Sequence, residues 1–347
     1  MNYLKLFFFP LLFIIQIIYL IFLILRNFFY DINILSEKKK NVNIICVGSL
    51  KLGGAGKTPL VEYLIKNFNN NDLAVLSRGY KRNTKGFLLA NKNDSSEKIG
   101  DEPLQIINNN PDLLVAVCEN RANGVEKLIS VNKNLKTVIL DDGFQHRSLF
   151  RNLNILVTEH DFLYCNDSLF PLGNLREYKA GSKRADIIVI TKCPKEISEE
   201  EKNKIKNELP ILENQKIFFS FIRYKSPVNY LNDKTEKLSP KDEYFLLTGI
   251  GNSKPLFNYL SNNKIKFSHF RYNDHHNFKE MELKNLIQKG KNMKIEKLIM
   301  TEKDFYRLGA VKLNLIKSYF DILILKIEFD FINEEKTMFN KQIRKFI

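Results

Sequence analysis

Apolar and polar positions follow two patterns along the chain, and the first is an uninterrupted apolar run. From Leu6 to Leu25 no residue is charged, and a run of about 20 such residues matches the hydrocarbon thickness of a bilayer. A secretory signal peptide would have a shorter apolar core followed by small residues, whereas Arg26 and the bulky segment 27–30 follow here. A buried core helix would show a polar face, which this run lacks. We therefore predict that residues 1–30 form a membrane-spanning anchor.

Basic residues flank this run unequally. Arg26 and Lys38–Lys40 follow it, whereas Lys5 precedes it, so the positive-inside rule places the rest of the chain in the cytoplasm. The cysteines agree with a reducing compartment, because no C-x-x-C pair indicates a disulfide frame or a zinc site. They are Cys46, Cys118, Cys165 and Cys193.

The second pattern begins after the anchor, where short apolar runs alternate with amphipathic stretches. Short strands with helical crossovers predict an α/β fold, in which helices cover both faces of a mainly parallel sheet. The expected strands are Val42–Leu50, Leu73–Ser77, Leu113–Cys118, Thr137–Leu140, Leu153–Thr158 and Ile187–Thr191. The expected helices are Leu60–Asn69, Glu102–Asn108 and Asn123–Ser130.

A second, shorter series follows the polar region 223–241, which we interpret as the connection between two domains. The sequence thus predicts a larger α/β domain over residues 31–225 and a smaller one over residues 226–347. The expected strands of the second series are Tyr244–Thr248, Lys266–Tyr272, Lys297–Met300 and Ile322–Ile327, and its expected helices are Lys254–Ser261 and Lys279–Lys289.

The segment LGGAGKTP, residues 52–59, joins the first strand to the first helix and has the composition of a phosphate-binding loop. The strict pattern requires a leading glycine where this chain has Lys51. The segment Gly53–Gly54–Ala55–Gly56 nevertheless leaves backbone N–H groups free to turn toward phosphate oxygens. Lys57 would reach the β- and γ-phosphates and the Thr58 hydroxyl would hold Mg²⁺. A glycine-rich turn without a ligand would not need this Lys-Thr pair.

Two acidic residues end a later strand, in the segment TVILDDGFQHR. The carboxyl end of a parallel strand lies beside the phosphate loop in a doubly wound sheet, so Asp141 or Asp142 is predicted to bind Mg²⁺ directly or through water. A turn at Asp142–Gly143 would explain one acid but not both.

Two further features of the sequence are less specific. They are the motif that bears on the identity of the nucleobase and the net charge of the chain. The segment ITKCP begins like a guanine-recognition motif, but Pro194 stands where that motif has Asp, so ATP is the predicted nucleotide. The formal net charge of +15 is compatible with nucleic acid, anionic lipid or a phosphorylated substrate, and with the solvated surface of a Lys-rich and Asn-rich protein.

An ordered series of motifs over most of the chain resembles the tetraacyldisaccharide 4′-kinases, the membrane-bound lipid A kinases of Gram-negative bacteria. The loop of that family also lacks the leading glycine. The motifs are VGSLKLGGAGKTP (47–59), SRGYKR (77–82), GDEP (100–103), ENR (119–121), DDGFQHR (141–147), PLGNLRE (171–177), ADIIVITK (185–192), LTGIGN (247–252), DHHNF (274–278) and TEKD (301–304).

The resemblance implies transfer of the ATP γ-phosphate, with Mg²⁺, to the 4′-hydroxyl of a tetraacylated glucosamine disaccharide 1-phosphate. It implies a phosphate-loop domain and a smaller domain that closes over ATP. The expected location is the cytoplasmic side of the inner membrane, with the lipid A precursor and the membrane as partners and neither nucleic acid nor a protein partner inferred. The alternatives are another membrane-tethered ATPase or GTPase, or a non-catalytic nucleotide-binding scaffold.

The resemblance also assigns residues. Asp101 is the expected base for the sugar hydroxyl and His275 its partner, although His276 is adjacent and Asp101 alone would read as a helix cap. Lys57 and Arg121 complete the predicted catalytic set, with Arg121 ranked before Arg78 as a phosphate clamp.

The remaining candidates have weaker signals. Glu177 would complete the Mg²⁺ shell or else pair with Arg176, and Gln145 and His146 would contact phosphate or metal-bound water. The segment Thr301–Asp304 would contact ATP or pack the smaller domain, and Lys38–Lys40 would lie near anionic lipid.

Overall fold

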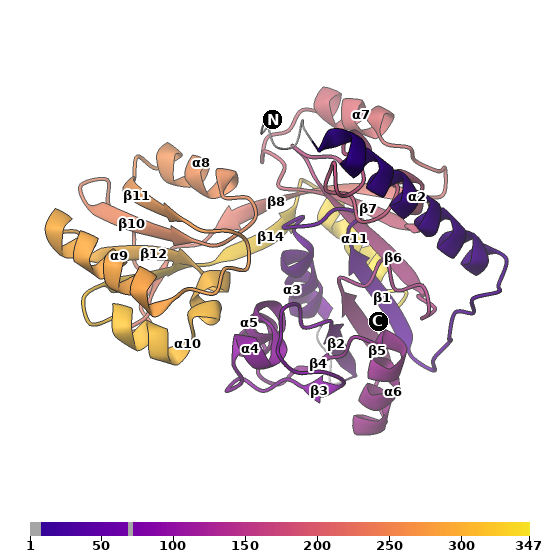
Figure 1. Ribbon diagram of the computed structural model, residues 1–347, viewed down its shortest axis with the longest axis horizontal. Coiled ribbons are helices and arrows are strands. Elements are labelled where there is room, and N and C mark those ends of the chain that lie inside the picture. The colour runs from indigo at the N-terminus through magenta and orange to yellow at the C-terminus, as the bar shows by residue number, and fades with distance from the viewer. Residues whose placement is uncertain (1–7, 69–71) are drawn as a thin grey trace.

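The apolar strands of the first series assemble into one nine-stranded sheet in a computed structural model that describes residues 8–68 and 72–347 (Figure 1). The strands are β1 (Asn43–Gly48), β2 (Leu73–Ser77), β3 (Leu88–Leu89), β4 (Leu114–Val117), β5 (Thr137–Asp141), β6 (Leu153–Glu159), β7 (Ile187–Thr191), β8 (Lys216–Tyr224) and β14 (Ile327–Phe331). Their order is β14-β8-β7-β6-β1-β5-β2-β4-β3. The β3–β4 and β8–β14 pairs at the two edges are antiparallel and the others are parallel. The predicted mainly parallel sheet is confirmed.

Successive residues of a strand point to opposite faces of the sheet. The apolar strands therefore present an apolar surface on each face, and helices cover both. Ile44 and Cys46 of β1 pack in a core with α6 and α7, whereas Ile45 and Val47 pack in a second core with α3, α5 and α11. The helices are α3 (Lys57–Phe68), α4 (Ser96–Ile99), α5 (Asp101–Asn109), α6 (Arg121–Val131), α7 (Glu199–Glu208) and α11 (Glu335–Ile343), with 3₁₀ turns η1 (Tyr164–Asn166) and η2 (Lys179–Arg184). The expected helix end at Asn69 lies outside the described residues.

The second series forms a separate five-stranded sheet with its own two cores. Its strands are β9 (Val228–Asn229), β10 (Glu243–Thr248), β11 (Lys266–Arg271), β12 (Lys297–Thr301) and β13 (Asp321–Leu325), and its helices are α8 (Lys254–Asn262), α9 (Glu280–Met293) and α10 (Glu302–Ile316). The order is β11-β10-β12-β13-β9, with only the β9 edge antiparallel.

The carboxyl-terminal segment returns to the larger domain, so the predicted domain 226–347 is wrong at its end. The predicted single strand over residues 322–327 is two strands: β13 stays in the smaller sheet, and β14 pairs with β8. Phe331 of β14 packs on Tyr63 of α3 and on Phe339 of α11, with ring centroids 5.2 and 4.3 Å apart. Strands β8 and β14 together connect the two lobes in Figure 1.

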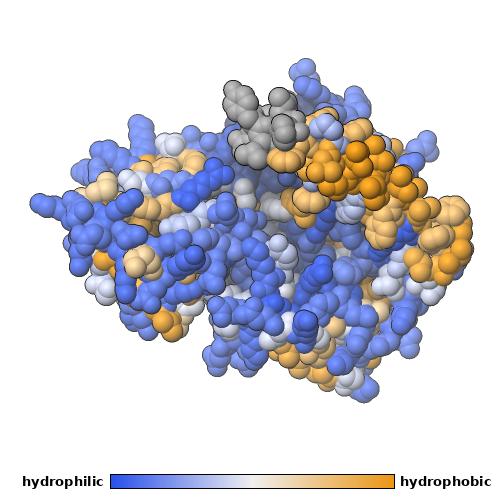
Figure 2. All heavy atoms as spheres, viewed as in Figure 1, coloured by the Kyte–Doolittle hydropathy of each residue, from blue (hydrophilic) through white to orange (hydrophobic). Residues whose placement is uncertain are grey.

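The expected apolar N-terminal helix is present as α2 (Phe9–Asp31), and in the described residues it is the one helix long and apolar enough to span a membrane. Residues 1–7, which include the start of the predicted anchor and the first two residues of its apolar run, lie outside the described residues. Much of the surface of α2 is exposed and apolar, as the orange band over this helix in Figure 2 shows. The opposite face is attached to the larger domain, where Leu23 is buried. Six hydrogen bonds join α2 to the larger domain in the described residues. Four are donated by α2, from Gln16 Nε2 to Leu169 O (2.5 Å), from Tyr19 Oη to Arg176 O (2.7 Å), from Arg26 Nη2 to Gln145 O (2.8 Å) and from Asn27 Nδ2 to Glu177 Oε1 (3.0 Å). Arg147 donates the other two, to Asn27 O (3.1 Å) and to Asp31 Oδ1 (2.8 Å).

Candidate functional site

The glycine-rich loop lines a cavity of about 660 Å³ between the two domains. The loop leaves the end of β1, and α3 begins directly at Lys57. Gly53 and Gly56 have φ values of 94° and 89°, which favour glycine. All six residues predicted to bind the nucleotide, from Gly53 to Thr58, face this cavity.

The smaller domain closes the cavity from the other side. A Cβ atom at Gly251 would lie 3.4 Å from the backbone nitrogen of Gly54 and 3.1 Å from a carboxylate oxygen of Asp274. The glycine therefore allows the smaller domain to approach the phosphate loop closely. His275, Thr301 and residues 302–303 line the same wall.

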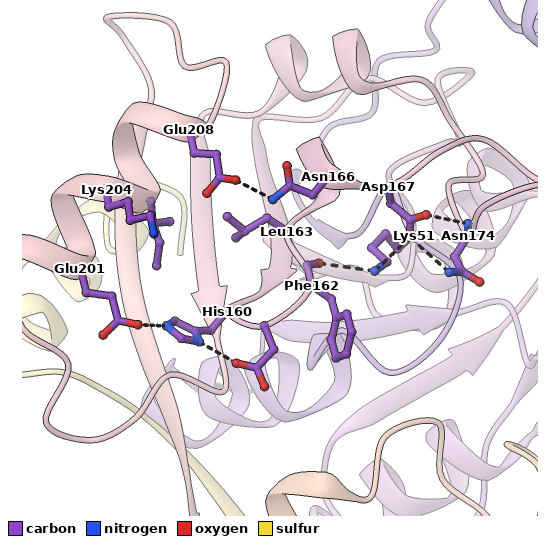
Figure 3. A pocket seen from close by; sticks show the side chains of 12 residues that line it. Lys51, His160, Phe162, Leu163, Asn166, Asp167, Asn174, Glu201, Lys204 and Glu208 are labelled. Carbon is purple, nitrogen blue, oxygen red and sulfur yellow. Dashed lines mark hydrogen bonds and ion pairs between the residues drawn. The ribbon is translucent and has the colours of Figure 1, made fainter. Parts of the chain in front are cut away.

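The strict phosphate-loop pattern has glycine at the leading position, where this chain has Lys51. The structure shows how a side chain is accommodated there. Lys51 points away from the cavity into a second hollow of about 440 Å³ on the larger domain (Figure 3). There its Nζ lies 3.1 Å from Asp167, and His160 is hydrogen bonded to Asp161 and Glu201. None of the predicted site residues lines this hollow.

The two acids at the end of β5 have opposite environments. Asp141 is paired in register with Val47 of β1, which places it beside the start of the phosphate loop. Asp142 lines the cavity, where two hydrogen bonds from Arg176 hold it and Lys57 Nζ lies 3.8 Å away. Burial favours the neutral acid, but Lys57 and Arg176 hold the pKa of Asp142 well below its usual range.

Asp141 has no such cations in contact. Its side chain is fully buried, and neither carboxylate oxygen has a hydrogen-bond partner among the described residues. Burial, with the nearby charges of Glu102 and Asp142, raises its pKa to about 8. A buried carboxylate in this state requires a proton or a cation.

Asp101 and His275 meet across the domain boundary. Asp101 is the first residue of α5, and its Oδ2 lies 2.9 Å from His275 Nδ1. Arg307 of α10 donates to the same oxygen over 2.8 and 3.2 Å. Burial opposes ionisation, but Lys303, His275 and Arg307 hold the pKa of Asp101 well below its usual range.

The structure distinguishes the two adjacent histidines. His276 Nε2 lies 2.9 Å from Glu282, and its ring stacks on Tyr272. His275 has the left-handed backbone φ of 57°, which is unusual for a residue with a side chain and directs it toward Asp101. Of the two, His275 is therefore the partner of Asp101.

Comparison with known sequences identifies the family. Residues 8–347 match the family described as Tetraacyldisaccharide-1-P 4'-kinase. The chain belongs to this family.

Full-length relatives and a solved structure agree with the membership. The chain is 40% identical to the tetraacyldisaccharide 4'-kinase of Flavobacterium johnsoniae over 349 residues, covering 100% of this chain and 98% of that protein. It is 37% identical to the enzyme of Bacteroides fragilis, covering 93% of this chain and 89% of that protein. The crystal structure of the "apo" form of LpxK from Aquifex aeolicus in complex with ATP has a TM-score of 0.72 at 27% identity, covering 99% of this chain and 100% of that one.

Four predicted site residues do not line the cavity: Asp101, Arg121, Asp141 and Glu177. Asp101 and Asp141 adjoin the lining residues His275 and Asp142, whereas Glu177 and Arg121 have other surroundings. Glu177 is fully buried, and its oxygens accept hydrogen bonds from Asn27 and Gln145 and an ion pair from Arg184. Its carboxylate accepts a hydrogen bond from Gln145 instead of facing the predicted metal. Glu177 is therefore not a proposed metal ligand.

Arg121 is the second residue with other surroundings. Its guanidinium is 1% exposed, donates to the carbonyl of Cys118, and has no partner for Nε and Nη2 among the described residues. Burial lowers its pKa to about 10, against the opposing charges of Asp142 and Asp141. Arg121 therefore lies behind the acid pair, whereas Arg78 lines the cavity.

The kinase site also includes basic side chains that were not among the catalytic, nucleotide-binding or metal-binding residues predicted from the sequence. Arg176 holds Asp142, Arg307 holds Asp101, and Lys303 lies 3.2 Å from His275 Nε2. Arg176 and Lys303 belong to quoted motifs, but no spacing in the sequence connects α10 to α5. Thr301 and Asp304 cap and pack α10: Thr301 Oγ1 donates to Asp304 over 2.6 Å, and Asp304 accepts the N–H of Gly249 over 3.0 Å.

The donor set fits Mg²⁺ bound together with a triphosphate. Within residues 8–68 and 72–347 no group of three His, Cys, Asp or Glu side chains is arranged to hold a metal alone. Mg²⁺ in nucleotide sites usually has one or two protein carboxylates, with phosphate oxygens and water completing its shell. The Thr58 hydroxyl at the start of α3 lines the cavity, and the unpartnered carboxylate of Asp141 lies at the end of β5 next to the lining residue Asp142, so these residues match that requirement.

Proposed function

We propose that this chain transfers the γ-phosphate of ATP to the 4′-hydroxyl of a tetraacylated glucosamine disaccharide 1-phosphate at the membrane surface. The observation that carries the proposal is that the phosphate loop and His275, which is hydrogen bonded to the buried Asp101, line one cavity in a member of this kinase family. The ATP bound to the Aquifex aeolicus protein supports the choice of nucleotide.

The larger domain holds the donor. Backbone N–H groups of the loop and the Lys57 ammonium bind the phosphates, and the start of α3 adds its positive dipole. Thr58 and Asp141 would hold Mg²⁺, which would supply charge neutralisation for the phosphates. Arg176 keeps Asp142 beside Lys57, so the position of the lysine is fixed before the nucleotide arrives.

Asp101 positions the acceptor. Its Oδ2 is held by His275 and Arg307, whereas its Oδ1 accepts the N–H of Glu102 over 3.0 Å and retains a free lone pair for a hydroxyl. The depressed pKa keeps Asp101 ionised but makes it a weak base. Phosphoryl transfer has a loose transition state and depends mainly on positioning, so a weak base that orients the hydroxyl and takes its proton is sufficient.

Isotope transfer tests this function. Purified protein with [γ-³²P]ATP, Mg²⁺ and the disaccharide 1-phosphate in detergent should move label onto the lipid. Release of inorganic phosphate at the same rate with and without the lipid, and no labelled lipid, would instead identify a membrane-tethered ATPase. Absence of turnover together with ATP binding would identify a scaffold.

We infer further that α2 lies along the membrane surface, with its exposed apolar face in the lipid, instead of crossing the bilayer. The hydrogen bonds to the larger domain extend from Gln16 to Asp31, about 22 Å of helix. A spanning helix needs about 20 residues free of the soluble domain. An in-plane helix also brings the cavity, which Tyr19 helps to line, close to a lipid substrate.

The apolar face of α2 should therefore govern membrane binding. Ile14 and Ile18 are 55% and 62% exposed, and the double variant Ile14→Glu/Ile18→Glu is expected to weaken vesicle binding at least about tenfold, because each buried aliphatic side chain contributes about 1.5–3 kcal/mol. Flotation with phosphatidylethanolamine–phosphatidylglycerol vesicles measures this. Val311→Glu, at an 85% exposed position of α10, is the matched control and should bind normally. Unchanged binding of the double variant would contradict the orientation.

A further inference from the structure

The end of β7 contacts the phosphate loop from the far side of the cavity. β7 ends at Thr191, and Lys192 and Cys193 follow before Pro194. Neighbouring strand β6 ends at Glu159, which is paired in register with Thr191. None of these residues has a role in the phosphoryl transfer described above.

Thr191 is fully buried against the loop. Its Oγ1 donates to the carbonyl of Ala55 over 2.8 Å, and it also lies 3.3 Å from the carbonyl of Thr158. A Cβ atom at Gly56 would lie 3.2 Å from the same hydroxyl oxygen. Because C=O and N–H point in opposite directions in a trans peptide, fixing the Ala55 carbonyl directs the N–H of Gly56 away from β7.

Lys192 makes the second contact. Its Nζ donates to the carbonyl of Gly54 over 2.6 Å and to Glu159 over 2.8 Å. Glu159 also accepts a hydrogen bond from Asn252 of the smaller domain over 3.1 Å. The backbone of Lys192 has φ of 58°, a strained value for lysine that bends its side chain back over the loop. The ammonium thus connects the phosphate loop, the end of β6 and the smaller domain.

Lys192 also lines the cavity that the phosphate loop faces. Ile222 and Tyr224 of β8 and Leu256 of α8 line the same space. A long aliphatic stem in this position can cover one face of a purine while its charged end is held elsewhere. Pro194 supplies no carboxylate for guanine.

We propose that Lys192 is a positioning residue for ATP. Its ammonium keeps the Gly54 carbonyl turned from the phosphates and adds a positive charge beside the loop, and its stem supports the base. The inference rests on the proposed use of ATP but not on the identity of the acceptor, so nucleotide binding tests it without the lipid.

Two variants separate the charge from the stem. Lys192→Met keeps most of the stem and loses the ammonium, and it should raise the Kd of Mg·ATP and of Mg·tripolyphosphate by a similar factor, about tenfold. A hydrogen bond to a charged group contributes about 1.5–3 kcal/mol, and 1.4 kcal/mol corresponds to tenfold. Lys192→Ala should weaken ATP several-fold more but tripolyphosphate no further, because only ATP has a base.

Titration calorimetry on the full chain in detergent measures both ligands. Lys195→Met, an exposed lysine three residues along the chain, is the matched control and should bind both ligands normally, and Lys192→Arg should recover most of the affinity. Wild-type affinity in Lys192→Met and Lys192→Ala would overturn the proposal, as would a loss of affinity in Lys195→Met as large as in Lys192→Met. If wild-type protein binds ATP but labels no lipid, the acceptor is wrong and the assignment of Lys192 stands.

Discussion

Replacing Asp101 by Asn should reduce kcat for label transfer by about 10²–10⁴-fold, the usual contribution of a positioned acid or base, while the Kd for ATP stays within about threefold. Asparagine has nearly the same shape as aspartate but neither takes a proton nor attracts the hydroxyl with a full charge. The nucleotide contacts lie on the loop and on Lys57, which the substitution does not touch. Single-turnover transfer from [γ-³²P]ATP measures the chemical step, and equilibrium titration measures ATP binding.

Removal of this charge also leaves Arg307 with less compensation, so a second variant is needed. His275→Ala leaves the Arg307–Asp101 ion pair intact, which joins the two side chains over 2.8 Å, and it should still lower kcat by at least about tenfold because Asp101 loses its orienting partner. Glu97→Gln, an exposed acid on the adjacent helix α4, is the charge-matched control and should transfer normally. Near-wild-type transfer in both Asp101→Asn and His275→Ala would contradict the assigned role.

The fold was predictable where local pattern determines it. Strands such as β2 and β7 match their predicted ranges because a short apolar run between turns has few alternatives. The phosphate loop was predictable because its glycines and Lys57 are consecutive. The return of β14 to the larger sheet was not, because β14 follows β13 with only Lys326 between them, and long-range packing on Tyr63 and Phe339 decides which sheet the second strand joins.

Interactions in the site were predictable from the sequence where both interacting residues lie in the same motif. Asp141 and Asp142 look equivalent in sequence, but the cations that separate them come from residues 57 and 176. Glu177 follows Arg176 directly, yet the two side chains have different partners, Asp142 for Arg176 and Arg184 for Glu177. Such differences depend on tertiary placement, which spacing does not encode.

The second large effect concerns Asp141. Asp141→Asn should lower transfer about 10³-fold or more at millimolar Mg²⁺, because the buried carboxylate is the protein charge that the metal needs and an amide oxygen cannot supply it. Raising the Mg²⁺ concentration should recover part of the activity. Transfer assays over a Mg²⁺ series measure this, and Asp112→Asn, an exposed acid at the opposite edge of the sheet before β4, is the control.

Asp141→Asn should lower transfer but raise the thermal stability of the metal-free protein. This combination distinguishes a metal ligand from an acid that supports the fold. The pKa of Asp141 is raised from its usual value to about 8, so without metal its contribution to stability is full below about pH 4 and is lost as the pH rises through 8. Asparagine has no charge to desolvate, and the variant in EDTA should therefore have a higher Tm than wild type at pH 9, with the advantage shrinking as the pH falls below 8 and disappearing near pH 4. A lower Tm at pH 9, together with loss of transfer that Mg²⁺ does not relieve, would mean that Asp141 supports the fold and that the metal binds through Asp142. A gain in stability with a loss of transfer is the expected result for a buried charge that is retained for the cation it binds.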